Sequence, residues 1–197
     1  MKQVCIIHGG STFESYDQYL TDLRTKDVKY ERLLYSPDWK PGLAVTLQAE
    51  GYDVLMPGMP CKQNAQYSEW TLLFDKIVPF LQLDTVLIGH SLGGIFLAKY
   101  LSSYPEVHAA KLILLAAPYD DETDEALASF KLTGDITPLA YSADEIHLFH
   151  SEDDPVVRIG ELHKFQRQLP SAVTHLFTDR SHFFAPDFPE LLAVIRD

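Results

Sequence analysis

The sequence predicts a three-layer, doubly wound α/β protein in which helices cover both faces of a mostly parallel, six-stranded sheet. Short apolar runs rich in Val, Ile and Leu recur along the chain. Most lack the strict alternation of a half-exposed strand, which is typical of strands buried on both faces of a parallel sheet. Longer amphipathic segments separate the runs, so strands alternate with helices.

The six runs expected to form strands are residues 3–8, 52–56, 85–89, 111–116, 145–150 and 172–178. The last two mix polar residues with apolar ones, so we expect them toward one edge of the sheet. Parallel strands need crossover connections, and right-handed crossovers place helices on both faces.

The segments expected to form helices are residues 43–50, 67–81, 92–103, 122–130, 159–169 and 188–195. The clearest pattern is in 67–81, whose apolar residues recur at spacings of three and four and form one stripe. The segment 92–103 ends before Pro105, as helices tend to end before proline.

Two connections are less regular than the rest. Residues 11–41 are long, aromatic and charged, and a connection of this length is usually functional or locally structured. Its aromatic side chains are candidates to cover a site beyond the first strand. Residues 117–144 have room for a helix and a loop but not for a large lid domain. With neither repeats nor a linker-like change in composition, we expect a single domain over residues 1–197.

Charge and cysteine content narrow the function classes. The formal net charge is −12, and an acidic surface disfavours nucleic acid and anionic membrane surfaces as partners. No apolar stretch approaches the ~20 residues of a membrane span. Cys5 and Cys61 lie far apart, with neither a disulfide framework nor the spacing of a metal site, which indicates a reducing, cytoplasmic location.

The most informative motif is Gly89-His-Ser91-Leu-Gly93, between the third expected strand and the third expected helix. A G-x-S-x-G sequence in this context is the nucleophile elbow of α/β-hydrolases. Both glycines are needed because the serine backbone is strained and its neighbours pack closely. The turn would aim the Ser91 hydroxyl out of the sheet, where the Leu92 amide can donate to an oxyanion. Ser91 is therefore the predicted nucleophile.

A serine nucleophile needs an oriented base, and in this fold the order along the chain is Ser, acid, His. Of the eight histidines, only His182 lies in a loop after the last expected strand, which makes it the candidate base. The acid should follow the preceding strand, where Glu152, Asp153 and Asp154 are adjacent. We favour Asp154 over Asp153, with Glu152 third, but single-sequence spacing does not decide between them.

Two further groups of candidates come from other strand ends. Asp120 and Asp121 follow the fourth expected strand and are minor alternatives for the acid. The Gly-Gly-Ser turn after the first strand is expected to supply the second oxyanion donor, because glycine lets the backbone approach a substrate carbonyl. The Gly10 amide is the first choice and the Ser11 amide the second, while the alternative is a turn that serves only chain reversal.

The chain resembles the small α/β-hydrolases typified by retinoblastoma-binding protein 9. The motifs that carry the resemblance are Val-Cys-Ile-Ile-His-Gly at 4–9, Asp-Trp-Lys-Pro-Gly-Leu at 38–43, Val-Leu-Met-Pro-Gly-Met-Pro at 54–60, Ser-Glu-Trp at 68–70, Ile-Gly-His-Ser-Leu-Gly-Gly at 88–94, Ser-Glu-Asp-Asp-Pro-Val-Val at 151–157 and Ser-His-Phe at 181–183. The resemblance implies a sheet without the first two strands of larger hydrolases, little or no lid, and a triad of Ser91, Asp154 and His182. Residues 11–41 depart from the compact family pattern.

These features together predict a carboxylesterase-like serine hydrolase that cleaves small ester, amide or thioester substrates through a covalent acyl-enzyme. Such chemistry requires no metal and no organic cofactor. Phe13, Tyr119 and Phe183 are candidates for an apolar acyl pocket, although core positions fit them equally well. The alternatives are an acyltransferase or thioesterase, and a protein-interaction module on a hydrolase scaffold.

Overall fold

The computed structural model describes residues 2–30, 33–120 and 126–197. Its sheet has six strands in the order β2-β1-β3-β4-β5-β6, and every neighbouring pair is parallel. The strands are β1 (Gln3–Ile7), β2 (Asp53–Leu55), β3 (Thr85–His90), β4 (Ala109–Leu115), β5 (Ala143–Ser151) and β6 (Val173–Phe177). The predicted doubly wound sheet is confirmed, with β6 at an edge and β5 beside it.

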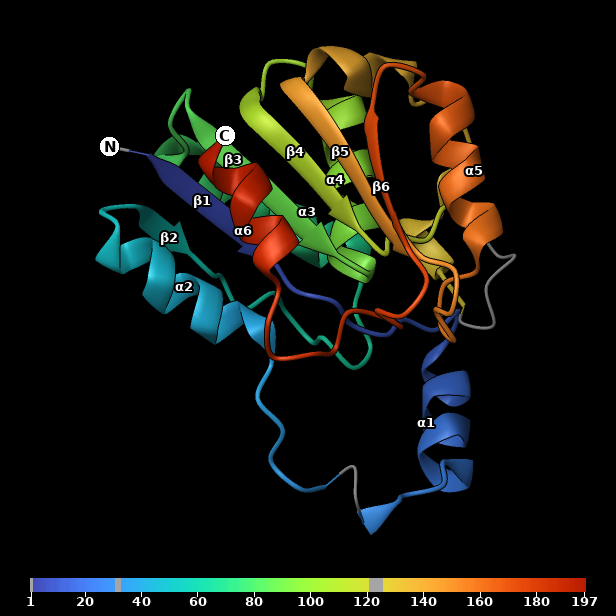
Figure 1. Ribbon diagram of the computed structural model, residues 1–197. Coiled ribbons are helices and arrows are strands. Elements are labelled where there is room, and N and C mark those ends of the chain that lie inside the picture. Colours follow the sequence, from blue (N-terminus) through green and yellow to red (C-terminus); the bar gives the residue numbers. More distant parts are fainter. Residues whose placement is uncertain (1, 31–32, 121–125) are drawn as a thin grey trace.

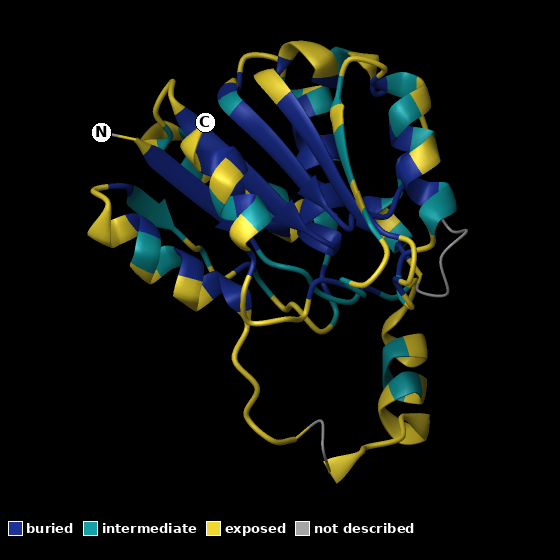
Figure 2. Ribbon diagram, in the orientation of Figure 1, coloured by how far each residue is buried: buried dark blue, intermediate teal, exposed yellow. Residues whose placement is uncertain are grey.

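Helices cover both faces of this sheet, as Figure 1 shows. The helices are α1 (Tyr16–Thr25), α2 (Trp39–Ala49), α3 (Tyr67–Ile77), α4 (Leu92–Ser103), α5 (Ile159–Gln168) and α6 (Pro189–Arg196). Helices α2 and α6 pack on one face, and α3, α4 and α5 on the other, so two apolar cores form. Figure 2 shows the central strands buried throughout, which explains why their sequences do not alternate.

Some helix boundaries differ from the predicted ones for local reasons. Helix α2 begins at Trp39, four residues early, because the Asp38 carboxylate accepts from the Lys40 amide and caps the helix. The predicted helix 67–81 ends as an α-helix at Ile77 and continues as a 3₁₀ turn over Val78–Phe80. Of the predicted helix 122–130, residues 122–125 lie outside the described residues, and Ala128–Phe130 is a 3₁₀ turn.

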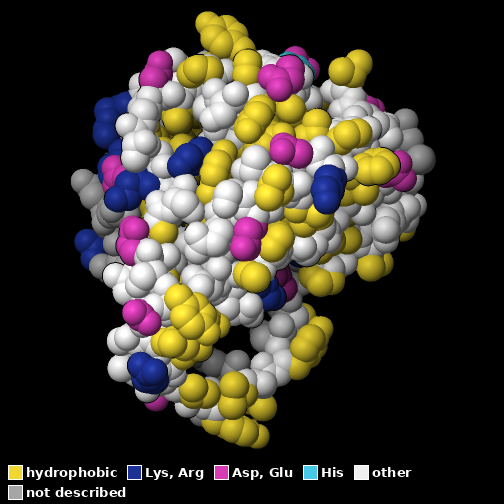
Figure 3. Space-filling model, turned by 180° about the vertical axis from the view of Figure 1, so that it is seen from behind, with side chains coloured by type: hydrophobic (Ala, Val, Ile, Leu, Met, Phe, Trp, Pro, Cys, Tyr) yellow, Lys and Arg dark blue, Asp and Glu magenta, His cyan; other side chains and the backbone are white. Residues whose placement is uncertain are grey.

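The segment 11–41 contains α1, a helix that was not among the predicted ones. None of the α1 residues is buried, and Figure 1 shows α1 and the following segment extending away from the sheet. Exposed large hydrophobic side chains gather on this projecting part, as Figure 3 shows from behind. They are Tyr16, Leu23, Val28, Tyr30, Leu33, Leu34 and Tyr35.

Among the described helices, none is long and apolar enough to cross a membrane.

Candidate active site

The turn between β3 and α4 holds Ser91 in a strained conformation. Its φ is 55°, in the left-handed region that non-glycine residues rarely adopt. A Cβ atom at Gly89 would lie 2.4 Å from the Gly93 carbonyl oxygen, and a Cβ at Gly93 would lie 2.3 Å from the Ile7 carbonyl oxygen. Real Cβ atoms do not approach so closely, so both positions require glycine. The motif therefore forms the tight turn that the sequence predicted.

Asp154 and His182 come together at the carboxyl edge of the sheet, although they lie 28 residues apart. Asp154 Oδ2 is 2.8 Å from His182 Nδ1. The other carboxylate oxygen, Oδ1, accepts from the amides of Val156 at 2.8 Å and Val157 at 2.9 Å. The Asp154 side chain is fully buried, so these bonds hold the carboxylate in a single orientation against the imidazole.

The neighbouring carboxylates take other roles. Asp153 accepts from the Ser151 hydroxyl and, at 2.9 Å, from the Ser181 amide, so it braces the loop that carries His182. The Ser151 hydrogen bond is the main cause that holds the pKa of Asp153 below its ordinary value. Glu152 is exposed. Asp120 pairs with Lys164 at 2.5 Å, and Asp121 lies outside the described residues.

Ser91 and His182 line one open cleft of about 250 Å³. The residues that line it are Gly9, Gly10, Ser11, His90, Ser91, Val156, His182 and Phe184. Between these described side chains, no hydrogen bond joins the Ser91 hydroxyl to the His182 ring. Catalytic hydrogen bonds are commonly longer in the free enzyme and shorten when substrate binds, so a shared cleft is the relevant arrangement.

The loop after β1 carries two amides near this cleft, and they differ in whether they already have a hydrogen-bond acceptor. The Ser11 amide donates to the Lys62 carbonyl at 2.8 Å, so it already has an acceptor. The Gly10 amide has no acceptor among the described residues, and Gly10 lines the cleft beside Ser91. A Cβ at Gly10 would lie 2.5 Å from the Lys62 carbonyl oxygen, which explains the glycine. Leu92 opens α4, and the first amides of a helix have no partner within it.

His8 positions that loop, a role the sequence did not reveal. Its Nε2 accepts from the Met59 amide at 2.9 Å, and its Nδ1 then carries the proton and donates to the Gly9 carbonyl at 2.6 Å. Burial lowers the pKa of His8 and so favours this neutral form. The only signal in the sequence is a His directly before the Gly-Gly turn, and its partner lies 51 residues away.

His90 ties the elbow to the loop of His182. The His90 ring is buried, and its Nε2 donates to the His182 carbonyl at 3.0 Å. Trp39 packs edge-on against the same ring, with centroids 6.1 Å apart. Burial holds the pKa of His90 well below its ordinary value, so the ring stays neutral and the bond stays in place.

Because of these buried histidines, we expect the free energy of unfolding to fall as the pH drops below about 6.5, where an unfolded histidine titrates. Burial lowers the pKa of His8, His90 and His150, so the unfolded chain binds protons that the folded chain does not. Each pKa unit of displacement is worth about 1.4 kcal/mol. Urea unfolding at pH 7.5 and 5.5 measures the change.

The His90→Gln variant serves as the comparison, since its amide retains a donor for the His182 carbonyl without titrating. It should lose less stability between the two pH values than the wild type. A urea midpoint independent of pH would contradict the expectation.

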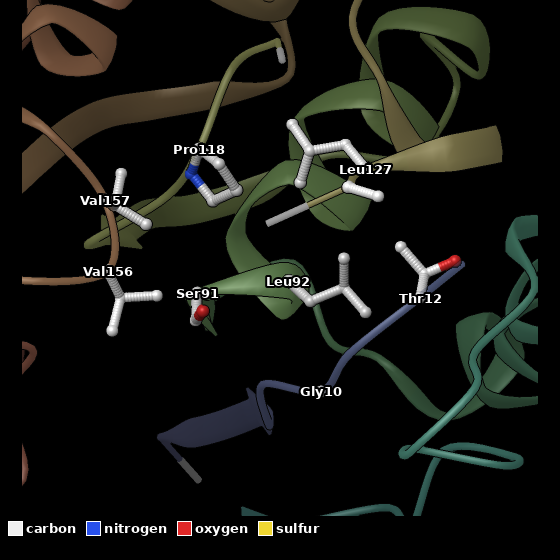
Figure 4. A pocket seen from close by; sticks show the side chains of 9 residues that line it. Gly10, Thr12, Ser91, Leu92, Pro118, Leu127, Val156 and Val157 are labelled. Carbon is white, nitrogen blue, oxygen red and sulfur yellow. The ribbon is translucent and has the colours of Figure 1, made fainter. Parts of the chain in front are cut away.

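A second, narrow hollow lies next to Ser91 and is shown in Figure 4. Its lining residues are Gly10, Thr12, Ser91, Leu92, Pro118, Ala126, Leu127, Val156 and Val157. The aromatic residues expected to form an apolar pocket lie elsewhere. Tyr119 packs edge-on against Phe165, and Phe183 stacks on Phe188. The apolar side chains that line this narrow hollow are therefore aliphatic. Within the described ranges, no cluster of three or more His, Cys, Asp or Glu could hold a metal ion.

Comparison with known proteins places the chain in a family. A family model described as serine hydrolase matches residues 38–185. The serine hydrolase RBBP9 of Rattus norvegicus is 28% identical over 159 residues, which cover 76% of this chain and 79% of the rat protein.

Solved structures show the same fold. The ydeN gene product of B. subtilis superposes with a TM-score of 0.79 at 20% identity, covering 100% of this chain and 97% of that one. Est1E of Butyrivibrio proteoclasticus, solved with ferulic acid bound, gives 0.64 at 13% identity, with 100% and 87% covered. The thioesterase domain from the curacin biosynthetic pathway gives 0.65 at 13%, with 100% and 91% covered. The fold is that of the α/β-hydrolases, and the chain belongs to the serine hydrolase family.

Proposed function

We propose that this serine hydrolase cleaves small carboxylic esters through a triad of Ser91, His182 and Asp154. The observation that carries the proposal is the 2.8 Å bond between Asp154 Oδ2 and His182 Nδ1, on the same cleft as the strained Ser91. A buried carboxylate that orients an imidazole on the same cleft as a turn serine is the arrangement of acyl-transfer enzymes.

The chemistry divides into two steps. In the first, His182 Nε2 takes the Ser91 proton as Oγ bonds to the ester carbonyl carbon, and the Leu92 and Gly10 amides donate to the resulting oxyanion. His182 then gives the proton to the departing alkoxide as its bond to carbon breaks, which leaves an acyl-enzyme. In the second, His182 takes a proton from water as the water oxygen bonds to the acyl carbon, and then gives it to Ser91 Oγ as the Oγ–carbon bond breaks and the acid leaves. Asp154 keeps the Nδ1–H tautomer and stabilises the imidazolium.

The cysteines support a reducing, cytoplasmic location for this activity. Cys5 and Cys61 are both free thiols. Burial raises the pKa of Cys5 to about 12, so it behaves as a small apolar core residue. We infer a small-molecule acyl substrate, because the cleft is open but small.

The proposal is tested with a fluorophosphonate probe, which reacts with activated serines. We expect the wild type to be labelled and the Ser91→Ala variant to lose all labelling. The matched control is Ser103→Ala at the far, exposed end of α4, which should label like the wild type. Hydrolysis of matched oxygen esters, thioesters and amides then ranks the substrate classes.

A folded wild type that the probe does not label would contradict the proposal and favour a protein-interaction module. Labelling that persists in Ser91→Ala would place the nucleophile elsewhere. Circular dichroism of each variant establishes that it is folded.

A further inference from the structure

The two hollows beside Ser91 differ in size, and the proposed mechanism indicates which part of the ester each one binds. In the tetrahedral intermediate the reacting carbon carries the Ser91 oxygen, the oxyanion, the leaving alcohol and the acyl substituent. The four groups point in four directions. The oxyanion points toward the Gly10 and Leu92 amides, so the leaving alcohol and the acyl substituent take the two directions that remain.

The leaving alcohol belongs on the His182 side. His182 must reach the alcohol oxygen to protonate it, so the alcohol occupies the cleft that His182 lines. The volume of this cleft is about 250 Å³. Phe184 lines the cleft, and 61% of its surface is exposed. An aromatic ring at the mouth of an open cleft provides a contact surface for an apolar alcohol group.

The acyl substituent is then directed to the narrow hollow in Figure 4, which His182 does not line. Its volume is about 10 Å³, room for about one water-sized group. The Thr12 hydroxyl donates to the Ala65 carbonyl at 2.8 Å and points away from the hollow, so Thr12 leaves its apolar atoms beside it. Apart from Ser91, the side chains that surround the acyl group therefore present apolar atoms to it.

The walls of this hollow resist enlargement. Leu127 is 3% exposed and Val157 is 2% exposed. Leu92 and Leu127 belong to the larger core cluster, and the Val157 backbone is fixed by Asp154 and by His150, whose Nε2 donates to the Val157 carbonyl at 2.9 Å. Packed cores transmit strain rather than yield, so a long acyl chain would have to displace core side chains.

We infer that the substrate joins a short acyl group, acetyl or propionyl, to a larger and partly apolar alcohol. The inference rests on the proposed function and adds which side of the ester is small. It assigns Pro118, Leu127 and Val157 as the residues that limit acyl length, and Phe184 as a contact for the alcohol.

The first test is a series of 4-nitrophenyl esters from acetate to octanoate. We expect kcat/KM to fall at least tenfold between propionate and hexanoate, since one methylene in an apolar pocket is worth about ten- to two-hundred-fold. Octanoate cleaved as well as acetate would overturn the inference. Failure of the proposed function looks different, because then no ester is cleaved and the fluorophosphonate probe does not label.

The second test enlarges the hollow. Leu127→Ala should raise the hexanoate-to-acetate ratio of kcat/KM at least tenfold, and Val157→Ala, a smaller truncation, should raise it in the same direction. The matched control is Leu101→Ala. Leu101 is also buried but lies near the C-terminal end of α4, far along the helix from Ser91, so this variant should leave the ratio unchanged. An unchanged ratio in both folded hollow variants would overturn the inference.

The third test addresses the alcohol side. Phe184→Ala should lower the preference for naphthyl acetate over ethyl acetate by about three- to tenfold and leave the acyl-length series as in the wild type. A shift in acyl length with no change in alcohol preference would show that the ester binds in the opposite orientation.

Discussion

Replacing Asp154 with Asn is expected to lower kcat by about four orders of magnitude while the protein stays folded. The Asn carbonyl can still accept from the Val156 and Val157 amides, which fixes the side chain in the Asp154 position. Its NH₂ group then faces His182 Nδ1 and donates to it, so the proton moves to Nε2. In that tautomer Nε2 cannot accept the Ser91 proton, and the base is lost. Steady-state hydrolysis of 4-nitrophenyl acetate measures the effect.

Asp153→Asn is the matched control, because the same change is made one residue away. Asp153 contacts Ser151 and the Ser181 amide rather than the His182 ring, and an Asn carbonyl can accept from both donors. We expect a loss of less than about tenfold, the effect of a slightly displaced loop. If Asp153→Asn lost the activity and Asp154→Asn kept it, the acid would be Asp153.

Gly93→Ala is expected to lower the free energy of unfolding by about 3 kcal/mol or more, the upper range for an overpacked core. The added methyl would lie 2.3 Å from the Ile7 carbonyl oxygen and 2.7 Å from that of His8. Both are backbone atoms at the end of β1, so relief requires α4 to move away from the central sheet. Urea unfolding gives the change in free energy, and fluorophosphonate labelling reports whether the elbow is displaced.

Gly42→Ala provides the opposite control. Gly42 lies in α2, and nothing lies within 4 Å of the position that its Cβ would take. Alanine is the better helix former by about 0.5–1 kcal/mol, so this variant should be more stable than the wild type. Equal stability of Gly93→Ala and the wild type would contradict the close packing of the elbow on β1.

Elements that pack against the sheet were predictable because burial leaves a pattern in the sequence. The stripe of 67–81 contains Trp70 and Phe74, which are fully buried. Helix α1 buries no residue, although Tyr16, Leu20 and Leu23 recur along it at spacings of three and four. It is held by local interactions instead, since the Ser15 hydroxyl accepts from the Gln18 amide at its start. Periodicity indicates that a segment can form a helix, but it does not show whether the apolar face of that helix is packed.

Residues of the candidate site were predictable where strand ends determine their position, and not where tertiary contacts do. Ser91 and His182 follow β3 and β6, and parallel strands bring such ends to one edge. Asp153 and Asp154 are adjacent on one loop, so only the contacts made by each carboxylate distinguish them. Likewise, the role of His8 depends on a Met59 amide that no local pattern connects to it.

The projecting segment between β1 and α2 has a consequence for how this fold tolerates insertions. Its two ends are fixed independently of its length, because Ser11 exchanges backbone hydrogen bonds with Lys62 and Ala65, while Trp39 is buried and packs edge-on against Phe188. The entropy of closing a loop grows only logarithmically, by about 0.6 kcal/mol for each doubling of its length. Natural variation or protein engineering can therefore shorten or replace this segment, even with a covering domain, at little thermodynamic cost to the hydrolase beneath it.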